Sequence, residues 1–139
     1  MEVRGVTPIL NVSDIRASID WFALVGWDEH WTYPEGDDEP GFGGLRSNGA
    51  QIFLCRNAQG SRDGRRPTHP GDDDTGGVWM SWWLDTPEDV DTAHAGAVAN
   101  GLEVTWPPTD EPWGVREFHL RHPDGHVFRV GSGLPEESG

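Results

Sequence analysis

The chain has 139 residues, the size of one ordinary domain, and a formal net charge of −14 from 24 acidic and 10 basic side chains. This charge would repel a phosphate backbone, so nucleic acid is not expected as a partner, and it favours solubility and the attraction of cationic small molecules. Cys55 is the single cysteine and cannot form an internal disulfide, and no apolar run has the length of a signal peptide or membrane span. We therefore expect a cytoplasmic protein with no membrane partner.

The first half of the sequence predicts the element order βαβββ. Residues 6–12 have the pattern of a strand, and Ile15, Ile19 and Phe22 recur at helical spacing in a helix that spans 14–25 and ends at Gly26. The aromatic stretch 27–33 follows. Asn48 and the glycine after it then give a strong hairpin signal between strands at 42–46 and 50–55.

The second half repeats this plan after a polar segment, 57–77, that predicts a linker loop. A strand at 78–84 precedes a helix that starts with a Thr-Pro-Glu-Asp cap at 86–89, and further strands are expected at 103–106, 117–121 and 126–130. The two halves share a period of 72 to 75 residues, from Val6 to Val78 and from Gly26 to Gly101.

We therefore expect one α+β domain, residues 1–139, made of two βαβββ modules at 1–56 and 78–133, with a tail at 134–139. Each module should form a curved mixed sheet with a helix on its convex side, which leaves a concave face open as a ligand groove.

Eight tryptophans against one tyrosine are the sharpest feature of the composition. A buried indole needs a partner for its N–H group, so several of these tryptophans are expected to line a cavity or an interface. Side chains alternate along a strand, so Trp79 and Trp83 share one face of the strand at 78–84 and Trp82 lies on the other. Only one of these two faces can pack on the helix.

Three stretches carry a resemblance to a known family: Asn-Val-Ser-Asp at 11–14, Leu-Val-Gly-Trp at 24–27 and Pro-Trp-Gly-Val-Arg-Glu-Phe-His-Leu-Arg-His-Pro-Asp-Gly at 112–125. The chain resembles the vicinal oxygen chelate superfamily of glyoxalases, extradiol dioxygenases, fosfomycin-modifying enzymes and bleomycin-binding proteins. The third stretch is similar to the Pro-Trp-Gly-x-Arg-Glu-Phe and Asp-Pro-x-Gly hairpin of bleomycin-resistance proteins. His122 stands where that family commonly has Asp.

Enzymes of this superfamily hold a divalent ion with His, Glu or Gln side chains from both halves. The resemblance places the four ligand positions at Thr7, near Ile52, near Trp79 and at Arg129, and none of these is a normal metal ligand. Gln51 is the nearest alternative at the second position. The six histidines are scattered and no catalytic constellation is legible, so we expect no metal, no other cofactor and no catalytic residue.

The leading hypothesis is that the protein captures a flat aromatic antibiotic, for which the net charge favours a cationic one, and gives resistance by sequestration. In bleomycin-resistance proteins two subunits share the groove, so the resemblance implies a homodimer. It maps the stacking aromatics onto Trp31, Phe42 and the Pro-Trp-Gly loop, and strand alternation adds two more rings. The expected ligand-binding residues are Trp113, Phe42, Trp31, Trp83, Trp79 and Gly114.

Each of these assignments has an alternative. Trp31, Trp79 and Trp83 could be core or dimer interface, and the glycines beside Phe42 could simply permit a bulge. Arg129 and Arg116 are expected to pair with a carboxylate such as Glu117 rather than with a ligand. Structural packing is expected for Trp21, Phe22, Trp27, Phe53 and Phe128.

Two other functions stay open. One is a divergent metal-dependent glyoxalase- or dioxygenase-type enzyme, which could borrow ligands from a partner chain. The other is a vestigial scaffold with an unknown ligand. The sequence also leaves open whether the modules pair within one chain or across a swapped dimer.

Overall fold

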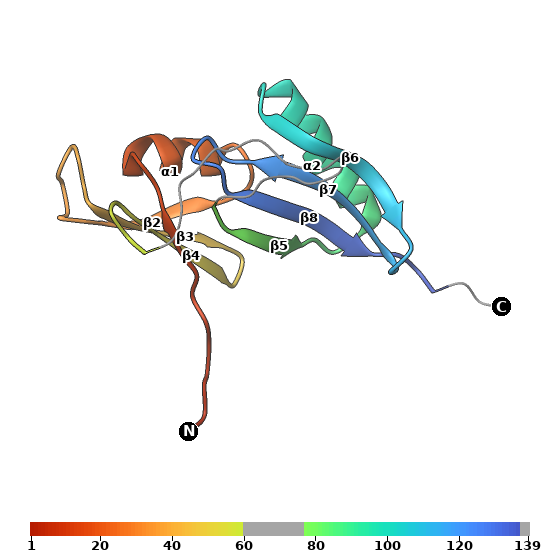
Figure 1. The fold of residues 1–139 in the computed structure, drawn as a ribbon, viewed down its shortest axis with the longest axis horizontal. Coiled ribbons are helices and arrows are strands. Elements are labelled where there is room, and N and C mark those ends of the chain that lie inside the picture. Colours follow the sequence, from red (N-terminus) through yellow and green to blue (C-terminus); the bar gives the residue numbers. More distant parts are fainter. Residues whose placement is uncertain (60–76, 137–139) are drawn as a thin grey trace. The chain divides into compact units, whose positions relative to one another are not determined.

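The computed structural model describes residues 1–59 and 77–136 and divides the chain into two compact units, Met1–Arg62 and Asp63–Gly139. Each unit has the order βαβββ, which confirms the expected α+β fold with two repeated modules (Figure 1). The linker expected at 57–77 lies almost wholly outside the described residues, and the tail is described only to residue 136. That the two modules make one domain stays a prediction.

The first unit is a four-stranded mixed sheet with one helix. Its strands follow the spatial order β1-β4-β3-β2, with β1 parallel to β4 and the other pairs antiparallel. The bounds of its elements are β1 Ile9–Asn11, α1 Ile15–Ala23, β2 Asp28–Tyr33, β3 Phe42–Ser47 and β4 Ala50–Cys55.

Helix α1 covers one face of this sheet. Asp14 caps it by accepting a hydrogen bond of 3.0 Å from the backbone N–H of Ala17, which satisfies one of the donors that a helix start leaves open. Its apolar stripe is buried, as the helical spacing predicted, and Phe22 is fully covered. From the sheet, Leu45 and Leu54 point into the same core.

The second unit repeats the arrangement. Its strands follow the order β5-β8-β7-β6, with β5 parallel to β8 and the remaining pairs antiparallel. The bounds of its elements are β5 Trp79–Trp83, α2 Pro87–Ala99, β6 Glu103–Glu111, β7 Val115–Arg121 and β8 Val127–Gly133.

Helix α2 begins as its sequence predicts. The hydroxyl of Thr86 accepts a hydrogen bond of 3.1 Å from the N–H of Asp89, and a proline fills the first turn. Val90 and Ala97 are buried on the face of α2 that packs on the sheet, and Phe118 and Phe128 are the buried aromatic residues of the sheet.

No helix among residues 1–59 and 77–136 is long and apolar enough to cross a membrane.

The largest differences from the expected strand bounds are in β1, β8 and β6. β1 is shorter than 6–12, and β8 runs on to Gly133. β6 continues past Trp106 through Pro107 and Pro108 to Glu111, with register shifts on either side of Trp106. β6 is the edge strand of its sheet, so a proline nitrogen on its outer side costs no ladder hydrogen bond. Two consecutive prolines face opposite sides of a strand, and the register shift between Trp106 and Thr109 accommodates the one on the β7 side.

Candidate ligand-binding site

The face of the first sheet that points away from α1 carries a cluster of three aromatic rings. Trp31 and Phe42 stack with centroids 5.3 Å apart and an interplanar angle of 11°. Phe53 meets both rings edge-on, at 5.0 Å from Trp31 and 6.0 Å from Phe42. Two of the expected site residues are therefore brought together, and Phe53, expected only to pack, completes the cluster.

Two glycines of β3 make room for this cluster. A Cβ on Gly44 would lie 2.3 Å from Nε1 of Trp31, so the indole lies directly over a residue without a side chain. On the other face, a Cβ on Gly43 would lie 3.1 Å from Cγ2 of Ile15 in α1. The register of β3 with β4 is regular from Phe42 to Ser47, so the alternative that Gly41 and Gly43, on either side of Phe42, permit a bulge there is wrong. The register shift lies in β2, between residues 29 and 31.

The second sheet also turns an aromatic face away from its helix. Trp79, Trp83 and Trp113 are 63%, 65% and 62% exposed. Trp82, between the first two in sequence, points to the helix side and stacks on Phe128 at 4.3 Å. The face of β5 that carries Trp82 therefore packs on the helix, and the face that carries Trp79 and Trp83 is exposed.

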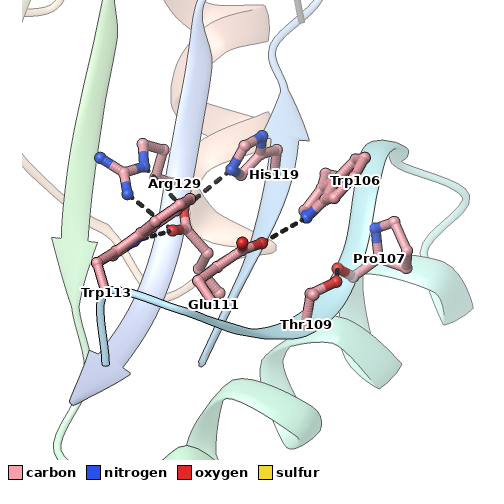
Figure 2. A network of polar contacts seen from close by, with 8 residues as sticks. Trp106, Pro107, Thr109, Glu111, Trp113, His119 and Arg129 are labelled. Carbon is pink, nitrogen blue, oxygen red and sulfur yellow. Dashed lines mark hydrogen bonds and ion pairs between the residues drawn. The ribbon is translucent and has the colours of Figure 1, made fainter. Parts of the chain in front are cut away.

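The polar centre of this open face is the carboxylate of Glu117, which is 2% exposed. Oε1 accepts from Nε1 of Trp113 at 3.1 Å and from Nη2 of Arg129 at 2.7 Å. Oε2 accepts from Nε of Arg129 at 2.7 Å and lies 2.9 Å from Nε2 of His119 (Figure 2). Each oxygen therefore has two partners, which is all that a carboxylate oxygen accommodates.

These contacts keep Glu117 ionised. The hydrogen bonds from Arg129, aided by the one to His119, lower the pKa of Glu117 to about 2 from 4.5, although burial acts in the opposite direction. The expectation that Arg129 pairs with Glu117 is confirmed. Arg116 also pairs with carboxylates, as expected, but with Asp110 at 2.6 Å and Asp91 at 3.0 Å rather than with Glu117.

The same centre links the tryptophans of this face. The guanidinium of Arg129 lies 5.3 Å from the ring centroid of Trp79, within cation–π range. His119 lies between Trp79, at 6.0 Å, and Trp106, at 6.3 Å. Nε1 of Trp106 donates to Oε1 of Glu111 at 3.0 Å, as Figure 2 shows. The aromatic rings are thus held in place by a polar network rather than by apolar packing alone.

The backbone fixes the loop that carries Trp113. Gly114 has a φ of +89°, a conformation that glycine adopts without strain. Its N–H donates to the carbonyl of Glu111 at 3.0 Å, and its carbonyl accepts from the N–H of Leu134 at 2.9 Å. Gly114 therefore contributes through the backbone, by setting the direction in which the indole leaves the sheet.

A shallow depression lies on this face, lined by Ser81, Trp83, Val115, Glu117, Arg129 and Gly131, and it has no room for a water molecule. Pockets for drug-sized ligands are much deeper. A ligand on this face would therefore lie on the exposed indoles rather than enter the sheet.

Sequence reasoning missed several residues of this network. Trp106 was not singled out, His119 was treated as a scattered histidine, and Glu117 was considered only as an arginine partner. Alternation along β7 places Glu117, His119 and Arg121 on one face, opposite Phe118, so the strand period alone could have grouped them.

Two βαβββ modules, each a four-stranded mixed sheet with one helix and an open aromatic face, define the structural class of this protein. The chain matches the model of the Glyoxalase/Bleomycin resistance protein/Dioxygenase superfamily over residues 5–130. The protein therefore belongs to this superfamily, as the resemblance predicted. No curated protein matches the sequence.

Solved structures agree with this assignment at the level of the fold. TioX from Micromonospora sp. ML1 is 19% identical with a TM-score of 0.69, over 96% of this chain and 99% of that one. The fosfomycin resistance protein FosX from Listeria monocytogenes is 15% identical with a TM-score of 0.68, over 96% of each chain. A glyoxalase/bleomycin resistance protein/dioxygenase from Nocardioides is 21% identical with a TM-score of 0.66, over 100% of this chain and 93% of that one.

The residues at three of the superfamily's four metal positions, Thr7, Trp79 and Arg129, are not normal ligands of a divalent ion. In the first unit, Ile52 is 1% exposed and points to the helix side, so it cannot be the ligand position on the open face. That position falls instead on one of its neighbours, Gln51 or Phe53. In the second unit, Arg129 places a cation at its position, and all four acceptor sites of Glu117 are taken. Among residues 1–59 and 77–136, no group of three or more His, Cys, Asp or Glu side chains could hold a metal.

Proposed function

We propose that this protein binds a flat aromatic antibiotic without a metal ion and gives resistance by sequestering it. The observation that carries this proposal is the state of Trp113. Its N–H group is fixed by the buried carboxylate of Glu117, while 62% of the side chain stays exposed. An indole with its polar edge anchored and its face in solvent is a preorganised stacking surface, so little side-chain entropy is lost when a ring lies on it.

The surrounding surface supports the same ligand class. Trp79 and Trp83 expose their rings on the same sheet face, and Trp31 with Phe42 forms a second aromatic surface in the first unit. Stacking contributes on the order of 1 kcal/mol per ring, so two or three rings together with burial reach micromolar affinity. The net charge of −14 would attract a cationic ligand over distance.

Among the related structures, FosX bears the description of a resistance protein, which supports a role in resistance here. The bleomycin-type subgroup is favoured by the stretch at 112–125. We propose further that the protein acts in the cytoplasm as a homodimer, which light scattering would test.

Titration with bleomycin-type and enediyne-type antibiotics, followed by tryptophan fluorescence, tests the proposal. Saturable quenching with one ligand per binding site is the expected result. The absence of saturable quenching by any flat aromatic ligand would instead favour a scaffold without a ligand.

A metal-dependent enzyme is the alternative function, favoured by the open-face position of Gln51 and by relatives whose descriptions name enzymes. Elemental analysis of protein purified without added metal separates the two functions, because a transition metal bound in stoichiometric amount would contradict metal-independent binding.

A further inference from the structure

The indole of Trp113 lies at the tip of the hairpin that joins β6 to β7. Glu111 ends β6, Val115 begins β7, and the two residues pair with each other, so the loop between them has three residues. Gly114 closes this loop with a φ of +89°, and its N–H group donates to the carbonyl of Glu111 at 3.0 Å. A glycine with positive φ at the last position is common in three-residue hairpin loops. The turn therefore uses the N–H group of Gly114 and leaves its carbonyl to another partner.

That partner lies just after the C-terminal end of β8. The N–H group of Leu134 donates to the carbonyl of Gly114 at 2.9 Å. Val115 pairs with Gly133 in the register of β7 with β8, so this bond lies one residue beyond the last pair of the ladder. The loop that carries Trp113 is thus bonded to a segment outside its own hairpin.

The sequence after β8 favours this last bond. Pro135 follows Leu134, and a residue before proline is held in an extended conformation, which continues the direction of the strand. Pro135 itself has no N–H group to donate, so the donor to the loop falls on Leu134. Leu134 lies beyond residues 5–130, over which the chain matches the superfamily model, so the family assignment gives this residue no role.

The position of the indole depends on the backbone of the loop. Nε1 of Trp113 donates to Oε1 of Glu117 at 3.1 Å, and this bond forms only when the backbone directs the side chain toward the carboxylate. The side chain is 62% exposed, so apolar packing contributes little to its position. The two hydrogen bonds of Gly114 fix the backbone next to Trp113, and one of them comes from Leu134.

We propose that Leu134 is a positioning residue for ligand binding, because its backbone N–H group holds the loop in the conformation in which the indole of Trp113 can stack on a ligand. This inference rests on the proposed function and gives the residue after β8 a part in it. Without the N–H group the loop can move, and the ligand must then order Trp113 when it binds. We expect the dissociation constant to rise about fivefold, the effect of ordering about one side chain.

Two chains that differ by one residue test the proposal. A chain that ends at Gly133 keeps the whole of β8 and lacks the N–H group of Leu134, whereas a chain that ends at Leu134 keeps this group. In the full chain, Leu134→Pro removes the same group, and Leu134→Ala, which keeps it, is the control. The melting temperature shows whether each variant is folded, and the shortened pair decides the test if Leu134→Pro does not fold.

Two measurements are made on each variant. The rate at which the indole N–H proton of Trp113 exchanges with water reports its bond to Glu117 without any ligand, and the signal is identified by its loss in Trp113→Phe. Titration with bleomycin, followed by tryptophan fluorescence, gives the dissociation constant. In the variants without the N–H group we expect faster exchange and about fivefold weaker binding. The exchange of Trp82, whose ring stacks on Phe128 on the helix side, should not change.

The outcomes separate this inference from the proposed function. Unchanged exchange in the variants without the N–H group would overturn the inference. Faster exchange with unchanged affinity for bleomycin would also overturn it, and sequestration would stand. If the unaltered protein does not bind bleomycin, the proposed function fails and the role of Leu134 in binding fails with it, while faster exchange in Leu134→Pro would still show that Leu134 fixes the indole.

Discussion

Arg129 and Glu117 are joined by two parallel hydrogen bonds of 2.7 Å, from Nε to Oε2 and from Nη2 to Oε1. This fork-to-fork geometry is specific to arginine and is stronger than a single-point ion pair. Because Glu117 also forms hydrogen bonds with Trp113 and His119, this ion pair connects the polar and aromatic side chains on the open face of the second sheet.

Removal of the guanidinium should destabilise the fold. Arg129→Gln leaves Glu117 buried without its cation, which we expect to cost about 3 kcal/mol in the free energy of unfolding. Arg129→Lys should recover only part of this loss, because an ammonium group cannot bond both oxygens in parallel. Urea denaturation measures both values, and a loss below about 0.5 kcal/mol for Arg129→Gln would contradict the structural role given to the pair.

Acid should destabilise the protein through His122. Burial, followed by the charge of the neighbouring His126, lowers the pKa of His122 to about 4, although Asp124 acts in the opposite direction. The unfolded chain takes up this proton near its ordinary pKa of 6.5, so full stability is present above pH 6.5 and is lost as the pH falls from 6.5 to 4. The expected loss is about 3 kcal/mol.

His122→Asn tests this prediction. Nδ1 of His122 accepts the N–H of Asp124 at 3.0 Å, and an asparagine oxygen can accept the same bond without titrating. Urea denaturation across this pH range should show a flatter dependence for the variant. Glu117, whose pKa falls from 4.5 to about 2 on folding, affects stability only below pH 4.5, so the slopes are compared between pH 6.5 and 4.5. The same slope in both proteins would exclude His122 as the cause.

A side chain on Gly44 should disrupt the aromatic cluster of the first sheet. Gly44→Ala places a methyl group 2.3 Å from the indole nitrogen of Trp31, so we expect a loss of about 2 kcal/mol in stability, measured by urea denaturation. The double variant with Trp31→Ala should lose less on addition of the methyl group. Gly49→Ala is the control, because nothing lies within 4 Å of its Cβ. Equal effects of the two alanines would show that the indole does not lie over Gly44.

The fold could be predicted from the sequence because its signals are local. The cap at Thr86, the turn at Asn48 and the helical spacing of Ile15, Ile19 and Phe22 each depend on a few neighbouring residues. The full length of β6 could not be predicted, because a Pro-Pro pair is rare within strands and its accommodation here depends on the edge position and the register shift of β6.

The site was harder to predict because its contacts are long-range. The alternation of side chains along a strand predicts that Trp79 and Trp83 share one face, and the Pro-Trp-Gly stretch indicates Trp113 as a ligand-binding residue. The grouping of Trp113 and Arg129 on one carboxylate depends on the pairing of β7 with β8 in a particular register, which short sequence patterns do not encode.

Substitution should separate the two roles of Trp113, the stacking of its exposed ring and the hydrogen bond from its N–H group to Glu117. Trp113→Ala removes the stacking face and should weaken a confirmed ligand by at least about 1 kcal/mol, with little change in melting temperature because the side chain is exposed. Trp113→Phe keeps an aromatic face and loses the bond to Glu117, so it should bind with intermediate affinity. Calorimetric titration measures the affinities, and a large fall in melting temperature for the alanine variant would mean that Trp113 is part of the core.

Sequestration requires that the protein binds its ligand without a metal ion and releases it unchanged. Titration of a bleomycin-type antibiotic into the protein in the presence of a metal chelator, followed by release of the ligand and measurement of its mass, tests both requirements. We expect saturable quenching of the tryptophan fluorescence that the chelator does not change, and recovery of the ligand with its mass intact. Binding that disappears with the chelator, or a ligand recovered with altered mass, would contradict sequestration.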